Sequence, residues 1–380
     1  MSRPIEIAIA GGGVIGLSIA YVLAREGVEC AIFDRGPLGR EASWAGAGLL
    51  PANCERVDTT PLNSLRTWSA LLYPEWSAAL LESTGIDNGY RRTGGVDVAA
   101  TDEEAAALQV AAGRWRREGI VFEKLPPGDH PRVEPLLADD LRAVYFLPDR
   151  AQIRNPRHLR ALEAAVAELG VEIRPDEPIV GFERSGERIA AVRTDRGSIP
   201  CRAAVIAAGA WSGALVESLG IQVPTPPIKG EIVLLRSERP LLRRIIEHGR
   251  NYLVPRDDGR IVVGATEEDV GFDKRSTARG VAGLLEIAIR ICPALAECEV
   301  ERAWAGLRPG SIDTRPYVGT IPGCVNLFIA TGHRRAGLQL APATAEVVAD
   351  LVLGRAPRVD LSGFAPDRES VLDEEPTFRS

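Results

Sequence analysis

The chain has 380 residues, which is enough for two domains with buried cores, since domains usually contain roughly 100–200 residues. Its 45% hydrophobic and 26% charged residues are typical of a folded globular protein and leave little room for long disordered segments. The net charge of −7 argues against broad attraction to nucleic acid or to an anionic membrane, so we expect a small-molecule partner.

The cysteines predict reduced thiols and no metal site. None belongs to a C-x-x-C pair, and none has zinc-like spacing to a histidine. The six positions are Cys30, Cys54, Cys201, Cys292, Cys298 and Cys324. An apolar run that begins by Ile5 leaves no room for a signal peptide, and no apolar stretch of about 18 residues follows. We therefore expect a cytoplasmic protein that does not bind or cross a membrane.

Residues 5–34 predict a strand, a helix and a second strand. An apolar run ends at Ala10, a helical pattern covers residues 14–26 and stops at Gly27, and a second apolar run over 28–33 ends on Asp34. In the helical part, apolar residues form one stripe, as in a helix packed on a sheet. Two such strands joined by a helix are expected to be parallel, with a right-handed crossover.

The turn of this unit carries a dinucleotide-binding fingerprint. Gly11, Gly13 and Gly16 form G-x-G-x-x-G, which permits a tight turn, close approach of a pyrophosphate and close packing of the helix. Asp34 ends the next strand 18 positions after Gly16, where a carboxylate can accept hydrogen bonds from ribose hydroxyls. The fingerprint alone does not distinguish NAD from FAD, because both present the same pyrophosphate and ribose.

The next segment favours a flavin. Residues 40–50 alternate Ala, Gly and Ser, which would let main-chain amides come close to a flat ring, although a plain flexible loop has the same composition. Helical patterns follow at 65–84 and 103–118, with a strand pattern between them.

The rest of the chain alternates between the two expected domains. A helix over 155–170 and several strand patterns indicate a return to the first sheet. A second β-rich block covers 228–302 and includes a helix over 276–291, which predicts a substrate domain. A final strand and helix are expected to rejoin the cofactor domain.

Six blocks in this order resemble the glycine oxidase branch of the D-amino acid oxidase family over essentially the whole chain. The blocks are AGGGVIGLSIAYVLAREG, REASWAGAGLL, VIAAGAWSG, NYLVPRDDGRIVVGAT, WAGLRPGSIDTRPYVG and ATGHRRAGLQLAPATAEVVADL. The resemblance implies an α/β fold with a Rossmann-type FAD-binding domain from residues 1–85, 150–225 and 303–370. A second, α+β substrate domain from 86–149 and 226–302 would carry a mixed, mostly antiparallel sheet.

The resemblance also implies which residues contact FAD. They are Gly11, Gly13, Val14, Ile15, Gly16, Asp34, Arg35, Ala42, Ser43, Ala47, Gly48, Leu49, Ile179, His333, Arg334, Arg335, Ala336, Gly337, Leu338 and Gln339. The last segment precedes a helix that we expect Pro342 to open, and a helix N-terminus would stabilise the anionic reduced flavin. No cysteine matches a covalent flavin link, so FAD is expected to bind non-covalently.

Three side chains match the family's substrate-binding positions. Arg308 would pair bidentately with the substrate carboxylate, Tyr252 would share that role through its hydroxyl, and Arg335 would lie close to flavin and substrate. A structural arginine and an interior tyrosine are the alternatives for Arg308 and Tyr252. Because the flavin performs hydride transfer, no catalytic side chain is expected, and a role for His333 as a base is disfavoured.

The function implied is oxidative deamination of glycine or another small amino acid. The products would be an imino acid, then an oxo acid and ammonia, with O₂ reduced to H₂O₂, in a homo-oligomer that serves thiazole formation in thiamine biosynthesis. Alternatives are a dehydrogenase that oxidises a D-amino acid or secondary amine and passes electrons to an acceptor other than O₂, and a non-catalytic flavin-binding subunit.

Three positions depart from the family pattern. Arg250 replaces a histidine, Glu267 a methionine and Arg334 an aromatic residue, so the pocket mouth is expected to carry more charge. Arg250 and Arg334 suggest a substrate with a second anionic group.

Overall fold

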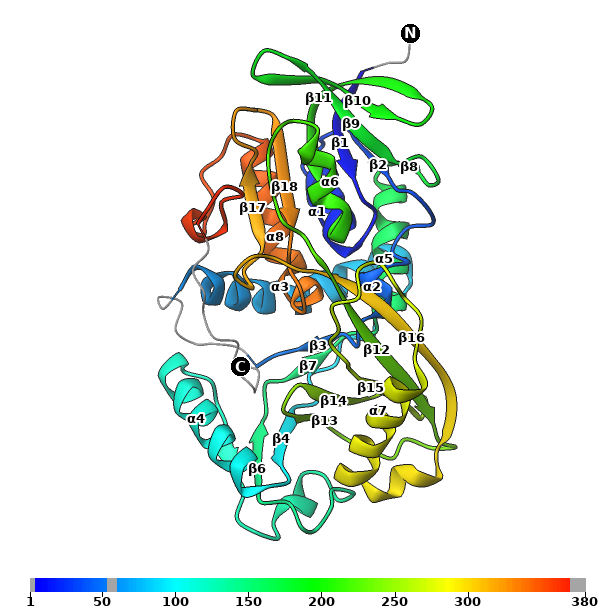
Figure 1. Cartoon of the computed structure of the whole chain (residues 1–380), viewed down its shortest axis with the longest axis vertical. Coiled ribbons are helices and arrows are strands. Elements are labelled where there is room, and N and C mark those ends of the chain that lie inside the picture. The colour runs from blue at the N-terminus through cyan, green and yellow to red at the C-terminus, as the bar shows by residue number, and fades with distance from the viewer. Residues whose placement is uncertain (1–3, 53–59, 370–380) are drawn as a thin grey trace.

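Two eight-stranded sheets, one above the other in Figure 1, form the framework of the chain. The structure is a computed structural model and describes residues 4–52 and 60–369. The upper sheet has the order β17 (Tyr317–Thr320), β18 (Leu327–Thr331), β11 (Gly197–Ile206), β1 (Ile5–Ala10), β2 (Cys30–Phe33) and β8 (Glu172–Arg174), and β10 (Arg188–Thr194) and β9 (Ile179–Ser185) extend it from β11.

Parallel pairing dominates the centre of this upper sheet. β1 pairs in parallel with β2 on one side and with β11 on the other. Strands buried on both faces read as continuous apolar runs, as β1 does. Ile7 and Ile9 face one hydrophobic core, while Ala8 and Ala10 face another. Because successive side chains of a strand point to opposite faces, β1 contributes to the cores on both sides of the sheet.

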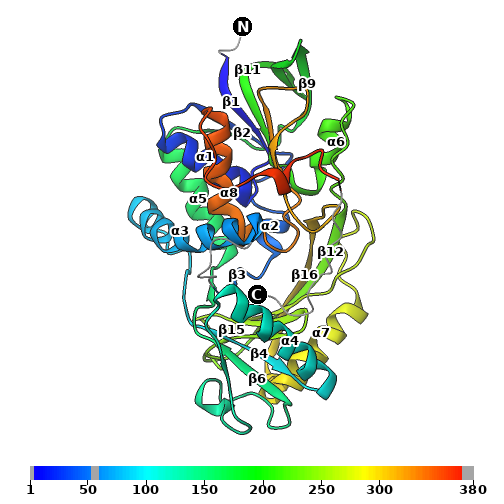
Figure 2. The same ribbon diagram turned by 90° about the vertical axis from the view of Figure 1, so that its left-hand side faces the viewer.

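Helices cover both faces of the upper sheet (Figures 1 and 2). The core around Ile7 and Ile9 is shared with α1 (Val14–Arg25), α3 (Pro61–Thr84), α5 (Asn155–Glu168) and α8 (Gly337–Val352). The opposite core includes Val216 of α6 (Ser212–Glu217). This is the layered arrangement of a Rossmann-type domain, so the predicted fold class is confirmed for the first domain.

The lower sheet is antiparallel except where β13 runs parallel to β4. Its order is β16 (Glu299–Pro309), β12 (Pro227–Arg236), β15 (Arg260–Gly264), β14 (Asn251–Pro255), β13 (Ile245–His248), β4 (Gly95–Ala99), β6 (Ala143–Leu147) and β5 (Glu123–Lys124). One face packs on α7 (Ala278–Ile291), and α4 (Asp102–Glu118) packs on the other near β6. The predicted mixed, mostly antiparallel sheet is therefore confirmed.

Short elements complete the chain between and beside the two sheets. α2 (Ala42–Ala45) and the strand pair β3 (Leu49–Leu50) and β7 (Ala151–Gln152) lie between the sheets, and 3-10 helices occur at His130–Arg132, Gly209–Trp211, Pro293–Glu297 and Ser362–Phe364. β16 pairs with β12 from Glu299 to Pro309, so it continues across the predicted boundary between residues 302 and 303. The domain boundaries themselves stay a prediction. Within residues 4–52 and 60–369, no helix has the length and apolar character needed to span a bilayer.

The expectation that Pro342 opens the last helix is wrong. α8 begins five residues earlier, at Gly337, and Pro342 lies inside it. A proline inside a helix has no N–H for the carbonyl four residues before it, here that of Leu338. The buried hydroxyl of Tyr73, on α3, donates to this carbonyl instead. The Leu338 carbonyl, which has no donor within the helix because of Pro342, thus accepts a hydrogen bond from another helix.

Replacing Tyr73 by phenylalanine removes only this donor, so we expect the free energy of unfolding to fall by about 1–2 kcal/mol. Urea denaturation of the FAD-saturated protein would measure the loss. Tyr145→Phe is the matched control, because Tyr145 is also buried but its hydroxyl donates no hydrogen bond to any of the described residues. Equal losses in the two variants would contradict a special role for the Tyr73 hydroxyl.

Candidate active site

A deep pocket lies between the two sheets and collects residues from both. All of the predicted FAD contacts line it except Gly16, Ala336 and Gln339, and the predicted substrate-binding residues Arg308, Tyr252 and Arg335 line it as well. The carboxyl ends of β1, β2 and β11 open at this edge of the upper sheet, where ligands of such folds bind. Residues far apart in the sequence therefore converge on one cavity.

The glycines of the fingerprint shape the floor of the pocket. Gly11 has φ +107°, a conformation that side-chain-bearing residues rarely adopt. A Cβ on Gly16 would overlap the carbonyl oxygen of Gly11, which explains why Gly16 serves helix packing and does not line the pocket. Gly13 is the N-cap of α1 and has no side chain of its own. The Ser43 hydroxyl on the opposite wall accepts from the Val14 amide at 2.9 Å, so the helix N-terminus faces the cavity with one of its first amides already bonded.

Asp34 lies at the end of β2 with its carboxylate turned back to the glycine turn. One oxygen accepts from the Gly12 amide at 2.7 Å and the other from the Gly36 amide at 3.2 Å. Burial raises the pKa of this carboxyl, and the two amides oppose that rise. A helix N-terminus beside a partly buried carboxylate suits a pyrophosphate next to a ribose, so the residues present fit the ADP half of FAD.

The segment 42–49 forms the wall between the two sheets and is fixed from outside. Three side chains from other elements each donate to one of its carbonyl groups: Asn155 to Ser43 at 2.8 Å, Trp304 to Ala45 at 2.9 Å and Arg256 to Ala47 at 2.5 Å. The alternative of a plain loop does not describe this segment. Its small side chains and fixed carbonyls suit close contact with a flat ring.

Arg256 is the charged member of these three donors. Arg256 is partly buried, and its guanidinium also donates to the Gln152 side chain at 2.6 Å and to the Ile153 carbonyl at 3.2 Å. Burial lowers the pKa of Arg256 to about 10, with the nearby charge of Arg154 as a second cause. The group is still protonated at neutral pH, and it places a positive charge directly behind the pocket wall.

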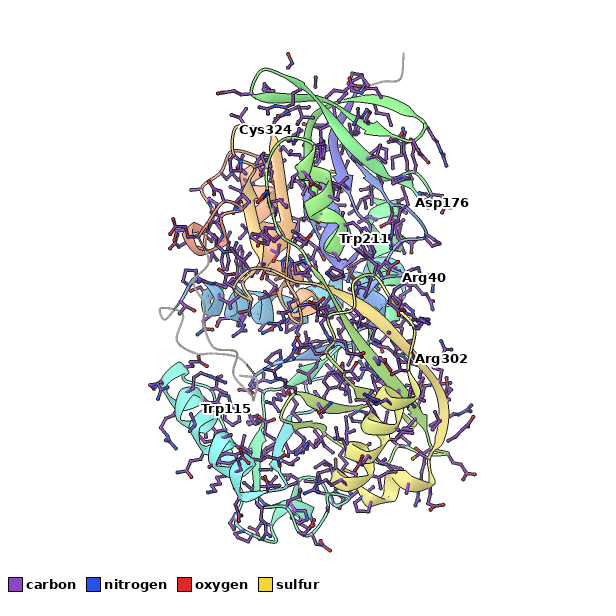
Figure 3. All side chains as sticks on the ribbon, viewed as in Figure 1. Arg40, Trp115, Asp176, Trp211, Arg302 and Cys324 are labelled. Atoms are coloured by element: carbon purple, nitrogen blue, oxygen red, sulfur yellow. The ribbon has the colours of Figure 1, made fainter. Side chains whose placement is uncertain are left out.

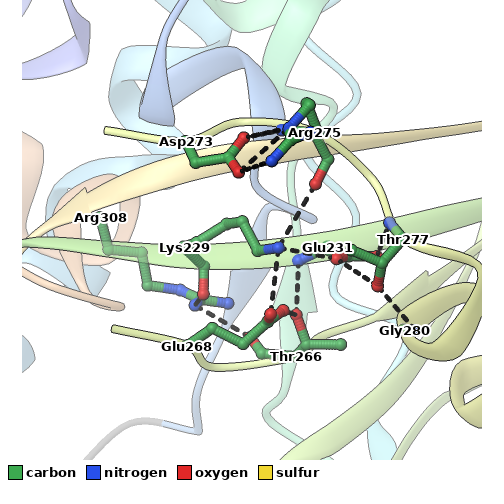
Figure 4. A network of polar contacts seen from close by, with 9 residues as sticks. All are labelled: Lys229, Glu231, Thr266, Glu268, Asp273, Arg275, Thr277, Gly280 and Arg308. Atoms are coloured by element: carbon green, nitrogen blue, oxygen red, sulfur yellow. Dashed lines mark hydrogen bonds and ion pairs between the residues drawn. The ribbon is translucent and has the colours of Figure 1, made fainter. Parts of the chain in front are cut away.

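Arg308 lies on β16 with its guanidinium over the neighbouring strand β12 (Figure 4). It donates to the Thr266 carbonyl at 3.1 Å and more weakly to the Lys229 carbonyl at 3.5 Å. A Cβ on Gly230 would overlap this guanidinium, so the absence of a side chain there makes the position of Arg308 possible.

Tyr252 repeats this arrangement on the adjacent strands. It lies on β14 opposite Gly264 of β15, and a Cβ on Gly264 would be 2.5 Å from the Tyr252 hydroxyl oxygen. The ring is 5% exposed. Each predicted substrate-binding side chain of the lower sheet therefore lies flat on a glycine of the next strand, which favours a built site over two unrelated side chains.

A polar network centred on the buried ammonium of Lys229 lies beside Arg308 (Figure 4). The ammonium of Lys229 contacts Glu231 at 2.9 Å, Glu268 at 3.0 Å and the carbonyl of Arg275 at 3.3 Å. Glu231 in turn accepts from the amide of Thr277 at 3.0 Å. The network ties β12 to the loop between β15 and α7, and that loop supplies the Thr266 carbonyl to Arg308.

His333 is buried and neutral. Its Nε2 lies 3.3 Å from the Thr344 hydroxyl, and burial lowers the pKa of the imidazole to about 3. It is not solvated, and it does not carry the positive charge of this segment at neutral pH. That charge belongs to Arg334 and Arg335, which line the pocket and both pair with Glu267.

The pocket residues that follow β11 were not predicted from the sequence. Trp211 lines the cavity, and the guanidinium of Arg35 lies 3.4 Å from the centre of its ring. Arg35 also pairs with Glu41 at 2.6 Å. The signal was available in principle, because β11 pairs with β1 in parallel and its carboxyl end must open at the same edge of the sheet.

The cysteines stand apart from the site. Within residues 4–52 and 60–369, no cysteine lines the pocket and the five that occur there are free thiols. Cys324 precedes β18, whose other end reaches the pocket at Thr331, and Figure 3 shows it well separated from Trp211. Cys54 lies outside the described residues. No cluster in the described ranges could hold a metal ion.

Comparisons with known proteins match nearly the whole chain. A family model described as FAD dependent oxidoreductase matches residues 6–351. The glycine oxidase of Pseudomonas aeruginosa is 36% identical over 362 residues, covering 95% of this chain and 98% of that protein. The bifunctional protein ThiO/ThiG of Nostoc sp. is 35% identical over 365 residues, covering 94% of this chain and 54% of that protein. The crystal structure of glycine oxidase from Geobacillus kaustophilus has a TM-score of 0.92 at 35% identity, covering 97% of this chain and 100% of that one.

Arg256→Met should weaken FAD binding by about tenfold, because the segment 42–49 loses a charged donor to the Ala47 carbonyl. Titration of the apoprotein, followed by quenching of flavin fluorescence, would measure the dissociation constant. Arg260→Met is the matched control, since the partners of Arg260 are Asp258 and Glu301, outside this segment. If the control weakened FAD as much, the bond to Ala47 would not be the cause.

Proposed function

Because the chain belongs to the family of FAD dependent oxidoreductases, we propose that it oxidises glycine, or another small amino acid, at its amine-bearing carbon. The family membership confirms the resemblance seen in the sequence and identifies the chain as an enzyme with FAD as its cofactor. The substrate proposal rests on Arg308 and Tyr252. Both line the same pocket, and each packs against a glycine of the neighbouring strand.

An amino acid oxidase needs side chains that hold its substrate in the correct orientation, and Arg308 and Tyr252 can do this. The planar fork of an arginine can bind both oxygens of a carboxylate, and a phenol can donate to one of them. Holding the carboxylate orients the neighbouring carbon toward the wall formed by residues 42–49. FAD held by the glycine turn and by residues 42–49 would supply the redox chemistry, as acceptor of a hydride from that carbon and donor of two electrons to O₂, which would leave as H₂O₂. No strong base is needed beyond loss of the ammonium proton.

The biological setting follows from the same relatives. The Nostoc protein joins a related segment to a second part under the name ThiO/ThiG, and this supports a role in thiamine biosynthesis, where the imino product of glycine would be consumed. We include in the proposal a cytoplasmic location and a homo-oligomeric state, which follow from the sequence resemblance.

One experiment tests cofactor, competence and substrate together. Purified protein with FAD is mixed anaerobically with glycine, sarcosine, D-alanine or D-aspartate, and the flavin absorbance is followed. We expect glycine or sarcosine to bleach the flavin and admission of O₂ to restore it with release of H₂O₂. Bleaching without peroxide would instead support a dehydrogenase with another acceptor, and no bleaching by any amine would support a non-catalytic flavin-binding subunit.

Arg308→Ala should raise the dissociation constant of carboxylate substrates by about 10²-fold, because one charged clamp is lost. Arg302→Ala is the matched control, since Arg302, labelled in Figure 3, is an exposed arginine on the same strand and does not line the pocket. The apparent affinity for glycine, taken from anaerobic flavin reduction, provides the measurement. An unchanged affinity in Arg308→Ala would remove this residue from the substrate site.

A further inference from the structure

Glu267 forms ion pairs with three arginines, two of which line the pocket. One carboxylate oxygen is 2.5 Å from Arg334, and the other contacts Arg335 and lies 3.3 Å from Arg250. Arg334 and Arg335 line the pocket, whereas Arg250 is about half exposed. Arg250 and Arg334, which the sequence suggested for a second anionic group of the substrate, are therefore already paired with a carboxylate of the protein itself.

The two residues that flank Glu267 in the chain, Thr266 and Glu268, are tied to β12 and β16 (Figure 4). The Thr266 hydroxyl accepts from the Glu231 amide at 2.9 Å, and its carbonyl accepts from Arg308. The carboxylate of Glu268 pairs with buried Lys229, and its main chain exchanges hydrogen bonds with Lys229 at 2.9 and 3.0 Å. Thr266 is bonded to Arg308 and Glu268 to Lys229. A large movement of Glu267 would therefore also disturb Arg308.

Arg335 and Arg334 stabilise the ionised form of Glu267. Partial burial opposes ionisation, but Arg335 and Arg334 outweigh it and lower the pKa of the carboxyl. Glu267 is therefore an anion at neutral pH. A second carboxylate on a substrate would have to compete with an anion that is covalently part of the site and needs no loss of translational freedom to bind there.

We propose that Glu267 is a specificity-determining residue that occupies the place of a second substrate carboxylate and restricts the enzyme to amino acids with one carboxylate. The inference rests on the proposed function and names its substrate class. The Glu267 carboxylate competes with a second substrate carboxylate for the same arginines, and it also repels that carboxylate at close range. Both effects discriminate against substrates with two carboxylates. Iminodiacetate and D-aspartate are the compounds that it excludes.

The test compares wild type with Glu267→Met, which restores the residue type expected from the family, and with Glu267→Gln, which removes the charge and keeps the shape. The readout is kcat/KM for iminodiacetate divided by kcat/KM for glycine. We expect glycine to be preferred by wild type and the ratio to rise about 10- to 100-fold in both variants, because two pocket-lining arginines become available to the second carboxylate. If Glu267→Met does not retain FAD, Glu267→Gln alone is sufficient for the test.

A binding measurement provides an independent readout. Dissociation constants of acetate and malonate are obtained from the change in flavin absorbance, and the variants should bind malonate more tightly with little change for acetate. Asp269→Asn is the matched control, because it removes one negative charge from an exposed residue two positions away. An equal gain in this control would show a general effect of charge and overturn the proposal.

The outcomes separate the two proposals. If wild type oxidises glycine and the ratio is unchanged in both variants, or if wild type already prefers iminodiacetate, the role of Glu267 is wrong while amino acid oxidation stands. If no amine reduces the flavin, the proposed function fails, and the malonate and acetate constants still decide whether Glu267 excludes a second carboxylate.

Discussion

The antiparallel pairing of β12 with β16 is the constraint on which the site depends. It places Gly230 beside Arg308, so that the guanidinium lies over a strand without a side chain in its way. On the same strand, Trp304 donates to the Ala45 carbonyl, and a Cβ on Gly306 would overlap Ala45. One pair of strands therefore builds the carboxylate clamp and supports the wall that faces the flavin. A change of register by one residue would turn these side chains to the opposite face and disable both.

The buried network around Lys229 connects the β12–β16 pair to the loop that carries Glu267. Charged groups removed from water are costly unless each one is paired, and here the ammonium has two carboxylates and a carbonyl. Removing one partner would leave the other charge buried, so the network favours a single arrangement of the loop between β15 and α7. The position of Glu267, and with it the electrostatics near Arg334 and Arg335, follows from a group that itself lies outside the pocket.

Local patterns in the sequence predicted the parts of the fold that depend on neighbouring residues. The strand–turn–helix unit through Asp34 is of this kind, since its spacing, glycines and apolar stripe are all local. The start of α8 was not predictable, because Pro342 is tolerated through a hydrogen bond from Tyr73, 265 residues away from Leu338. The partners of Glu267 were equally hidden, since they come from separate strands and loops. The resemblance supplied Arg308 and Tyr252, but only the strand register shows why each has a glycine beside it.

The burial of the thiols has a consequence for the lifetime of an oxidase. An enzyme that releases H₂O₂ exposes its own polypeptide to an oxidant at every turnover, and thiolates are the side chains that peroxide attacks most readily. Burial raises the pKa of Cys30 to about 12 and of Cys201 to about 11, and it also raises the pKa of Cys292. These groups stay protonated and shielded at neutral pH. With a single methionine in the whole sequence, the chain offers its own product few sites for oxidative self-inactivation.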